Sequence, residues 1–285
     1  MSKITKIIEM IGMPNDTAEY CEECFAIIEA DPHLSSLLQT TQAQYMAAFP
    51  PEKAIEKISK ESGFHRYTVN LIVLLCMADS LHGIYKVKGY SESSFLDFMV
   101  NIRCKIAECK QVYNIHGSFV FFEFKRYFQC TTFALGRLCF EARPVPFDYR
   151  DVCKKGDTVI GCHIPSSGPL RPDEIEDSFR QAYEFYGIEG KMIVTCNSWL
   201  LFPPFYREVF PEGSNLSRFY ELFEVVEQRE CAYEDFGWRV FGTMDPDLDK
   251  LPLKTTLQKN LHAYMKNGGT LGSGYGILVR DFGKP

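Results

Sequence analysis

One segment, residues 157–202, constrains the fold of this chain more than any other. It has the pattern of a strand over 158–164, a small glycine-containing loop over 165–171, an amphipathic helix over 172–186 and a second strand over 191–196. A loop directly before a helix presents free backbone N–H groups and the positive end of the helix dipole. Because open sheets place ligands at strand ends, this β-loop-α-β unit predicts a site for an anion such as a pyrophosphate.

The chain up to residue 113 carries the hydrophobic periodicity of helices, with apolar side chains three or four positions apart. Five or six helices are expected, among them a short one over 4–11 and a long one over 91–113. Residues 69–81 are apolar nearly all round, which predicts a central buried helix that ends at Gly83. We therefore predict a helical N-terminal domain over residues 1–116.

The pattern changes after Gly117, and strands and helices then alternate to the end of the sequence. Residues 119–128 fit either a short helix or a strand, whereas residues 131–143 alternate as a single strand does. After residue 202, the expected elements are a helix over 216–228, a strand over 237–242, a helix over 255–266 and a strand over 275–280. The predicted fold class is α+β, with a sheet domain over residues 117–285 that has flanking helices.

Composition and charge exclude several classes of protein. The 285 residues are 46% hydrophobic and 24% charged, as in ordinary globular proteins. No run approaches the ~20 apolar residues of a membrane span, and the N-terminus is amphipathic where a signal peptide would be apolar. The net charge of −6, without a basic stripe, argues against nucleic acid as a partner. We expect a cytoplasmic protein with no membrane or nucleic-acid partner, and its oligomeric state stays open.

Cysteine is frequent, with 11 in the chain. Most of these residues stand beside apolar neighbours, so we interpret them as reduced, small core side chains. Cys21 and Cys24 form a C-x-x-C, but no second cysteine pair and no spaced histidine pair completes a zinc site. Both fall on one helix face, so core packing explains them and no metal is expected.

Four short runs carry a family resemblance. They are residues 134–141 (ALGRLCFE), residues 161–170 (GCHIPSSGPL), residues 196–201 (CNSWLL) and the Ser214-Asn215 pair before a helix. In this order they resemble a bacterial group of acyltransferases that pairs a helical N-acyltransferase N-terminal domain with a GNAT-like C-terminal domain. The likeness spans most of the chain, although each motif is short.

The resemblance implies an acyl-CoA-dependent N-acyltransferase with a mixed, mainly antiparallel sheet in which two neighbouring parallel strands splay apart. By this mapping the splayed strands are 158–164 and 191–196, and acyl-CoA, the implied cosubstrate, enters between them. Its pyrophosphate would lie at the loop and helix start, which comprise Ile164, Pro165, Ser166, Ser167, Gly168, Leu170 and Arg171.

The loop departs from the family pattern in one respect. GNAT enzymes commonly carry a Q/R-x-x-G-x-G/A loop, whereas this one has a single glycine and a proline, Pro169, that lacks an N–H. Asp173 and Glu174 also occupy the first helical turn, where they complement the dipole and repel a diphosphate. Arg171 offsets part of this charge. A degenerate enzyme that has lost CoA is therefore an alternative.

His163 and Glu141 are the two candidate general bases. His163 lies in the C-terminal part of the strand over 158–164, beside the loop. An unperturbed imidazole titrates near neutral pH, so it can take a proton from an amine. A hydrogen-bonded histidine inside a sheet is the equally weighted alternative. By the resemblance Glu141 adjoins the acceptor side, although a solvated edge carboxylate is the commoner outcome.

Cys196 and Tyr220 complete the catalytic candidates. Cys196 is a nucleophile only if a neighbouring cation or helix N-terminus lowers the pKa of its thiol, and otherwise it is a core residue. Tyr220 falls roughly where GNAT enzymes often keep a tyrosine acid for the leaving thiolate, although fifteen tyrosines make coincidence easy. The candidate substrate-binding residues are Asn197, Ser198, Trp199 and Arg137, with packing as the alternative for Trp199.

Three functions compete at this point. The first is transfer of an acyl group from CoA to a small-molecule amine by direct attack in a ternary complex. The second is a covalent acyltransferase that uses Cys196 and His163. The third is a non-catalytic binding or scaffold protein on a degenerate GNAT-like fold, which the acidic helix start favours. Neither the acceptor nor the acyl length can be read from the sequence.

Overall fold

The computed structural model describes residues 3–47 and 51–283, and the chain divides into two compact units, residues 1–133 and 134–285. The first unit is helical and extends beyond the predicted boundary at residue 116, because the aromatic segment that follows packs into it. The ring of Phe121 lies 4.3 Å from that of Tyr45, and the ring of Phe128 lies 5.7 Å from that of Phe98. This segment therefore belongs to the core of the helical unit.

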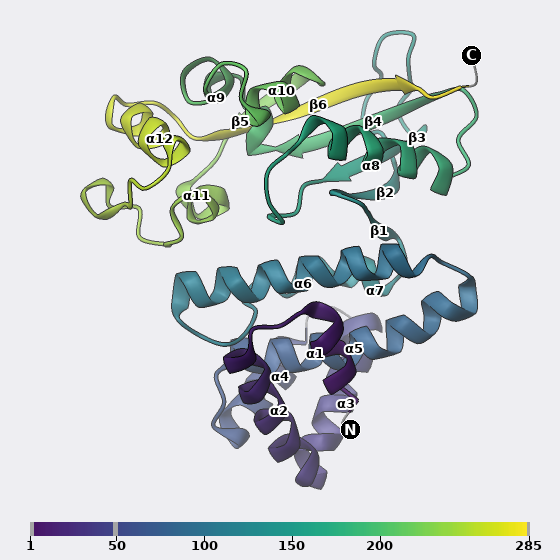
Figure 1. The fold of residues 1–285 in the computed structure, drawn as a ribbon, viewed down its shortest axis with the longest axis vertical. Coiled ribbons are helices and arrows are strands. Elements are labelled where there is room, and N and C mark those ends of the chain that lie inside the picture. Colours follow the sequence, from purple (N-terminus) through teal and green to yellow (C-terminus); the bar gives the residue numbers. More distant parts are fainter. Residues whose placement is uncertain (1–2, 48–50, 284–285) are drawn as a thin grey trace. The chain divides into compact units, whose positions relative to one another are not determined.

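The helical unit contains six longer helices followed by two short ones in its described residues (Figure 1). They are α1 (Thr5–Ile11), α2 (Asn15–Ala30), α3 (Pro32–Ala47), α4 (Glu52–Ser62), α5 (Arg66–Lys88), α6 (Glu92–Tyr113), the 3₁₀ turn η1 (Phe122–Phe124) and α7 (Lys125–Phe128). The predicted helical bundle is thereby confirmed.

Helix α5 is the buried centre of this unit, as its apolar sequence predicts. It continues through Gly83 and ends at Gly89, which has the left-handed φ of 70° that closes a helix. The predicted end at Gly83 was wrong, because a glycine inside a well-packed helix costs only about 1 kcal/mol. Helix α5 is long and apolar enough to cross a membrane, yet 72% of its apolar window is buried inside the unit. Such burial is typical of a core helix.

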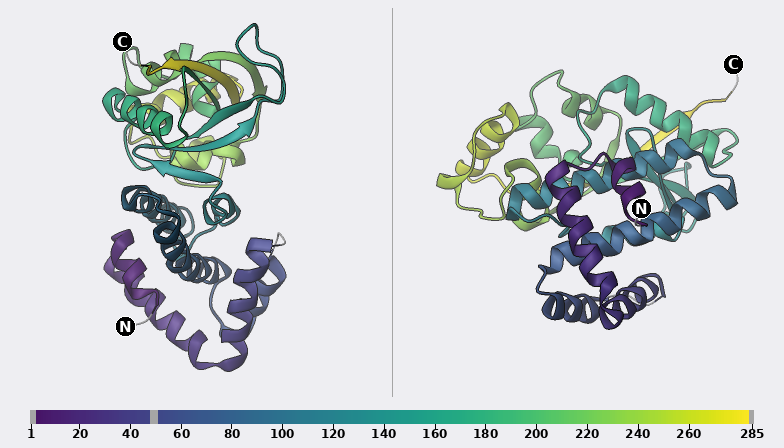
Figure 2. Two further views of the ribbon diagram at one scale, coloured as in Figure 1. Left: turned by 90° about the vertical axis from the view of Figure 1, so that its right-hand side faces the viewer. Right: turned by 60° about the horizontal axis from the view of Figure 1, so that its bottom comes forward.

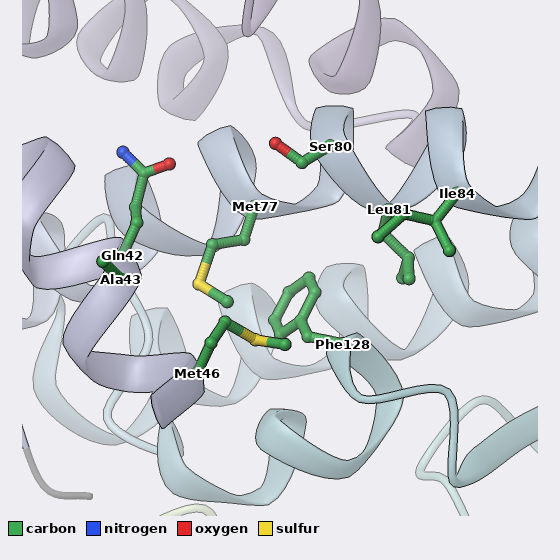
Figure 3. Close-up of a pocket in the computed structure, with 8 residues that line it drawn as sticks. All are labelled: Gln42, Ala43, Met46, Met77, Ser80, Leu81, Ile84 and Phe128. Carbon is green, nitrogen blue, oxygen red and sulfur yellow. The ribbon is translucent and has the colours of Figure 1, made fainter. Parts of the chain in front are cut away.

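A cavity of about 230 Å³ opens between α3, α5 and α7 (Figure 3). Its lining comprises Gln42, Ala43, Met46, Met77, Ser80, Leu81, Ile84 and Phe128. The side chains of Met46, Met77 and Phe128 converge on it, so the surface that it presents is mainly apolar. None of the site residues predicted from the sequence lines this cavity.

The second unit is built on a six-stranded mixed sheet with the order β1-β2-β3-β4-β6-β5 (Figure 1). The strands are β1 (Thr132–Leu135), β2 (Leu138–Pro144), β3 (Thr158–His163), β4 (Lys191–Ser198), β5 (Glu224–Glu230) and β6 (Gly272–Asp281). Strands β3 and β4 are parallel, whereas the pairs β2–β3, β4–β6 and β5–β6 are antiparallel. The predicted fold class is confirmed.

Helices flank this sheet (Figures 1 and 2). They are α8 (Pro172–Phe185), α9 (Pro203–Glu208), α10 (Asn215–Glu221), α11 (Tyr233–Phe241) and α12 (Thr256–Lys266), with 3₁₀ turns η2 (Trp199–Leu201) and η3 (Leu248–Lys250). Helix α8 packs on one sheet face, where the ring of Phe179 lies 5.9 Å from that of Phe140. The hydroxyl of Tyr186, just after α8, donates to the carbonyl of Phe140 over 2.9 Å.

The single strand predicted over 131–143 is two strands. Strands β1 and β2 are separated by a turn at Gly136, whose φ of 66° is readily adopted only by glycine. The apolar alternation runs on through the turn, so periodicity alone did not reveal the break.

Two further sequence predictions were wrong. The helix expected over 216–228 ends at Glu221, and the chain re-enters the sheet as β5, which pairs with β6. The strand expected over 237–242 is the end of α11. That helix begins where the Asp235 carboxylate accepts a hydrogen bond from the amide of Ala232 at 3.0 Å. Packing against Trp199, whose ring stacks on Phe236 at 5.1 Å, then stabilises α11.

Gly274 in β6 allows the chain at η2 to cross very close to the sheet. A Cβ at this position would overlap the backbone carbonyl of Leu201, which no side-chain rotation relieves. We expect Gly274→Ala to lower the free energy of unfolding by about 3 kcal/mol, at the upper end of overpacking effects. Urea unfolding followed by circular dichroism measures this change.

The matched control is Gly83→Ala, because a Cβ at Gly83 meets nothing within 4 Å and the position is helical. It should leave stability unchanged or raise it by up to about 1 kcal/mol. Equal stabilities of Gly274→Ala and the parent protein would show that the close crossing is not required.

Candidate active site

The two parallel strands part at one end of the sheet. Pairing between β3 and β4 covers only three positions, the last of which joins Cys162 to Cys196. Beyond it, His163 stays paired with Cys139 of β2, whereas Ser198 stays paired with Gly274 of β6. The two strands therefore follow different neighbours, and backbone groups at their carboxyl ends are left for a ligand.

The loop over 165–171 leads from this parting to the start of α8. Arg171 is the N-cap of the helix, makes no side-chain capping bond, and is followed by Pro172 at the first helical position. Its guanidinium pairs with the Glu174 carboxylate at 2.7 Å. In the described part of the chain, the amides of Ser167 and Leu170 donate to no other backbone carbonyl. The helix start thus keeps unsatisfied amides, and one of its two acidic side chains has a cationic partner.

The side chain of Arg137 holds this loop through the backbone carbonyls of the loop. Its guanidinium donates to the carbonyls of Pro165 at 2.8 Å, Gly168 at 2.6 Å and Pro169 at 3.2 Å. In a trans peptide the carbonyl and the following N–H point in opposite directions. The amides of Ser166 and Leu170 therefore face away from Arg137. Arg137 thus fixes the backbone of the loop, and the substrate contact that we predicted for it stays a prediction.

His163 and Glu141 form a hydrogen-bonded pair on the sheet face opposite α8. His163 Nε2 lies 3.0 Å from Glu141 Oε1. The Glu141 side chain is only 9% exposed, whereas that of His163 is 34% exposed. With Nε2 directed at the carboxylate, Nδ1 is the nitrogen that can accept a proton, as in other carboxylate–histidine pairs. The two predicted bases thus act as one unit in which the histidine reaches solvent.

Arg143 and Thr195 belong to the same cluster, and sequence analysis missed both. The Arg143 guanidinium lies 3.4 Å from Glu141 Oε1 and donates to the Thr195 hydroxyl at 3.0 Å. Its side chain passes over Gly161 of β3 on the way. The available signal was the i, i+2 spacing of Glu141 and Arg143, which places two opposite charges on one face of a strand.

Cys196 lies on the other face of the sheet. In the pairing of β3 with β4, Cys196 lies opposite Cys162. Cys162 in turn lies opposite Phe140 of β2, whose ring contacts Phe179 of α8. His163 is one residue further along β3 and so points to the opposite side. Burial holds the pKa of the neighbouring Cys162 thiol well above its ordinary value, with the contact to Cys196 as a further cause. The structure does not bring Cys196 and His163 together.

The last two residues of β4 and the first residue of η2 differ in their surroundings. Asn197 is exposed at the strand end. The Ser198 hydroxyl accepts a hydrogen bond from the amide of Leu200 at 3.2 Å and thereby caps η2. Trp199 stacks on Phe236 with an interplanar angle of 5°. Of the three, Asn197 is exposed, whereas Ser198 and Trp199 are half-buried.

Tyr220 lies on α10 and stacks on Tyr206 with ring centroids 4.2 Å apart. Burial raises the pKa of the Tyr220 hydroxyl, and the nearby Arg207 opposes this only in part. A raised pKa keeps the hydroxyl protonated, so this group can donate a proton but not accept one near neutral pH.

Two domain families match the chain. Residues 132–278 match the family model of the GNAT-like C-terminal domain, and residues 2–130 match that of the N-acyltransferase N-terminal domain. No match to the sequence of a curated protein is found.

Solved structures with the same fold are acyltransferases. One, in complex with decanoyl-CoA, has a TM-score of 0.74 and 20% identity, and the alignment covers 96% of this chain and 86% of that one. A second, with decanoyl-CoA and teicoplanin, has a TM-score of 0.65 and 17% identity over 97% and 99% of the two chains. A third, with CoA and 10C-teicoplanin, has a TM-score of 0.62 and 17% identity over 96% and 98%.

Proposed function

We infer the function of this chain from its family. It belongs to the family defined by the GNAT-like C-terminal domain and joins to it an N-acyltransferase N-terminal domain, so it is an acyltransferase. We propose that it transfers an acyl group from acyl-CoA to a small-molecule amine by direct attack within a ternary complex. The observation that carries this proposal is the parting of β3 and β4 beside both the open start of α8 and the His163–Glu141 pair.

The donor site comprises the strand gap and the loop. We place the CoA pyrophosphate at the amides of residues 166–174, where the positive end of the α8 dipole favours an anion. The pantetheine then runs between the ends of β3 and β4 and bonds to backbone groups that lack a strand partner. Acyl-CoA bound to structural relatives supports this assignment, as does Arg137, which turns the loop carbonyls away from the ligand.

The chemical step uses His163 as the general base. Nδ1 takes a proton from the acceptor ammonium or amine, directly or through a water, while Glu141 holds the ring by Nε2. The neutral amine attacks the thioester carbonyl, whose developing negative charge is stabilised by backbone N–H groups at the end of β3. The C–S bond then breaks, and the CoA thiolate takes a proton from Tyr220 or from water. The nitrogen of the new amide gives up its second proton to the group that has just been deprotonated.

The acceptor is a small molecule that carries an amine. One structural relative binds teicoplanin together with decanoyl-CoA and another binds 10C-teicoplanin together with CoA, which supports an acceptor of this size. Asn197 is the exposed polar side chain that we assign to acceptor contact. We place the protein in the cytoplasm, which the eleven cysteines of the chain support if they serve as reduced core side chains, because thiols stay reduced there.

A covalent route through Cys196 is less well supported by this geometry. A thiol needs a base within hydrogen-bond reach, and the sheet separates Cys196 from His163. Cys196→Ala should therefore retain activity, and intact-mass measurement should show no acyl adduct on the protein.

Isothermal titration with CoA, acetyl-CoA and decanoyl-CoA tests the donor site. We expect each to bind with one site per chain, and mass spectrometry should detect N-acylation when an amine acceptor is added. The double variant Ser167→Pro/Leu170→Pro removes two loop amides and should abolish binding. Absence of heat with all three ligands would exclude the proposed function and leave the scaffold alternative.

A further inference from the structure

The carboxylate of Glu141 is held from two sides. Nε2 of His163 lies 3.0 Å from its Oε1 atom, and Nη1 of Arg143 lies 3.4 Å from the same atom. A carboxylate so little exposed is stable in its charged form only when partners compensate for the lost water. If Arg143 supplies positive charge, His163 does not need to be protonated to neutralise Glu141.

Arg143 reaches this position through a gap that one glycine leaves. A Cβ at Gly161 would lie 2.6 Å from Nε of Arg143, which is closer than such atoms approach. Gly161 lies inside β3, where glycine is unfavourable unless another group passes close to the backbone. The glycine therefore serves to admit the arginine side chain across the strand.

The far end of Arg143 is fixed as well. The Nη2 atom of Arg143 donates to the hydroxyl of the fully buried Thr195 on β4. The guanidinium also lies 5.9 Å from the ring centroid of Tyr275 on β6. One side chain thus spans β2, β3 and β4 just before β3 and β4 part. An arginine held at both ends has little rotational freedom left, so the Glu141 oxygen that it contacts is fixed too.

We propose that Arg143 is a positioning residue of the acyltransferase, which fixes Glu141 on His163 so that Nδ1 of the histidine stays unprotonated and faces the acceptor. This deepens the proposed function and rests on it. Arg143 contacts neither substrate nor cofactor in this account. It acts through Glu141, and Gly161 and Thr195 hold it in place.

The consequence of losing Arg143 follows from charge and geometry. Without it, Glu141 loses one of the two contacts that hold its Oε1 atom, and a protonated His163 becomes the favoured partner of the carboxylate. The imidazole then populates both tautomers and the charged form, and each of these withdraws Nδ1 from base catalysis. Binding of acyl-CoA is unaffected, because Arg143 contacts neither the loop nor the start of α8 in the described chain.

The spectroscopic test uses ¹⁵N-histidine-labelled protein, with the His163 signals assigned by their loss in His163→Gln. In the parent protein we expect a protonated Nε2 and an unprotonated Nδ1. In Arg143→Gln the two nitrogen shifts should move toward each other. The matched control, Arg180→Gln, removes an exposed arginine that also lies over a ring, that of Phe282, and should leave the spectrum unchanged. This measurement needs no turnover, so its result does not depend on whether the proposed function is correct.

Gly161→Ala should break the contact between Arg143 and Glu141 in another way, because the added methyl group displaces the Arg143 side chain without removing it. Each single variant should lower kcat about tenfold with KM for acyl-CoA unchanged. The double variant should be no slower than Arg143→Gln alone, because the methyl group has nothing left to displace. Parent-like His163 signals in both Arg143→Gln and Gly161→Ala would overturn the inference, whether or not the enzyme transfers acyl groups.

Discussion

Replacing His163 by glutamine is expected to lower kcat about 100- to 1000-fold, the range lost when a general base is removed. Glutamine keeps a polar side chain that can reach Glu141 but cannot accept the proton of an ammonium. The Kd of acyl-CoA should change by no more than about twofold, because the histidine lies at the reacting end of the site. Steady-state kinetics together with calorimetry separate the two quantities.

His262→Gln is the matched control for this change. His262 lies on α12, where its Nε2 is 3.1 Å from the carbonyl of Leu248, outside the cluster of β2, β3 and β4. If kcat is that of the parent protein in His262→Gln but is reduced in His163→Gln, His163 is assigned as the general base. A His163→Gln enzyme with full kcat would remove His163 from the mechanism and direct attention to Glu141.

Replacing Arg137 by glutamine is expected to raise the Kd of acyl-CoA about 100-fold. The change removes all three hydrogen bonds that fix the loop carbonyls, so the loop amides no longer point together at the pyrophosphate. Hydrogen bonds that involve a charged group contribute about 1.5–3 kcal/mol each, so losing the array is sufficient for this effect. Saturating acyl-CoA should restore kcat, because the His163–Glu141 pair is untouched.

The control for Arg137 is Arg207→Gln. Arg207 is an exposed arginine on α9 of the same unit and makes no contact with the loop over 165–171 in the described chain. Its Kd for acyl-CoA should equal that of the parent protein. If Arg137→Gln binds acyl-CoA normally but loses its acceptor, Arg137 has the substrate-binding role that its position in sequence first indicated.

Much of the fold could be predicted because single elements carry strong periodicity. The apolar run of α5 and the strand-loop-helix-strand order of residues 157–202 are local patterns, and the structure confirms both. The family resemblance is likewise confirmed by the two domain matches.

The errors occurred where distant contacts decide the conformation. Helix α11 is stabilised by Trp199, some forty residues earlier, and strand β5 by pairing with β6, which follows about fifty residues later. No local window contains such partners. The turn at Gly136 was hidden for a different reason, because the apolar alternation on its two sides is continuous.

The site was predicted in parts. His163 and Glu141 were identified one at a time, but their hydrogen bond depends on the register of β2 against β3, which the sequence does not reveal. Arg143 and Gly161 were missed, since an arginine on a strand and a glycine inside one are unremarkable until their side-by-side positions are known. Cys196, for which a core position was the alternative to a nucleophile, is buried on the far face of the sheet.

A crystal structure with a non-hydrolysable thioether analogue of decanoyl-CoA tests the central claim most directly. We expect the pyrophosphate at the amides between Ser166 and Glu174, and the pantetheine in the gap beyond the Cys162–Cys196 pair. The acyl carbonyl should lie on the His163 side. A nucleotide bound elsewhere, or β3 and β4 closed against each other with the analogue excluded, would contradict it.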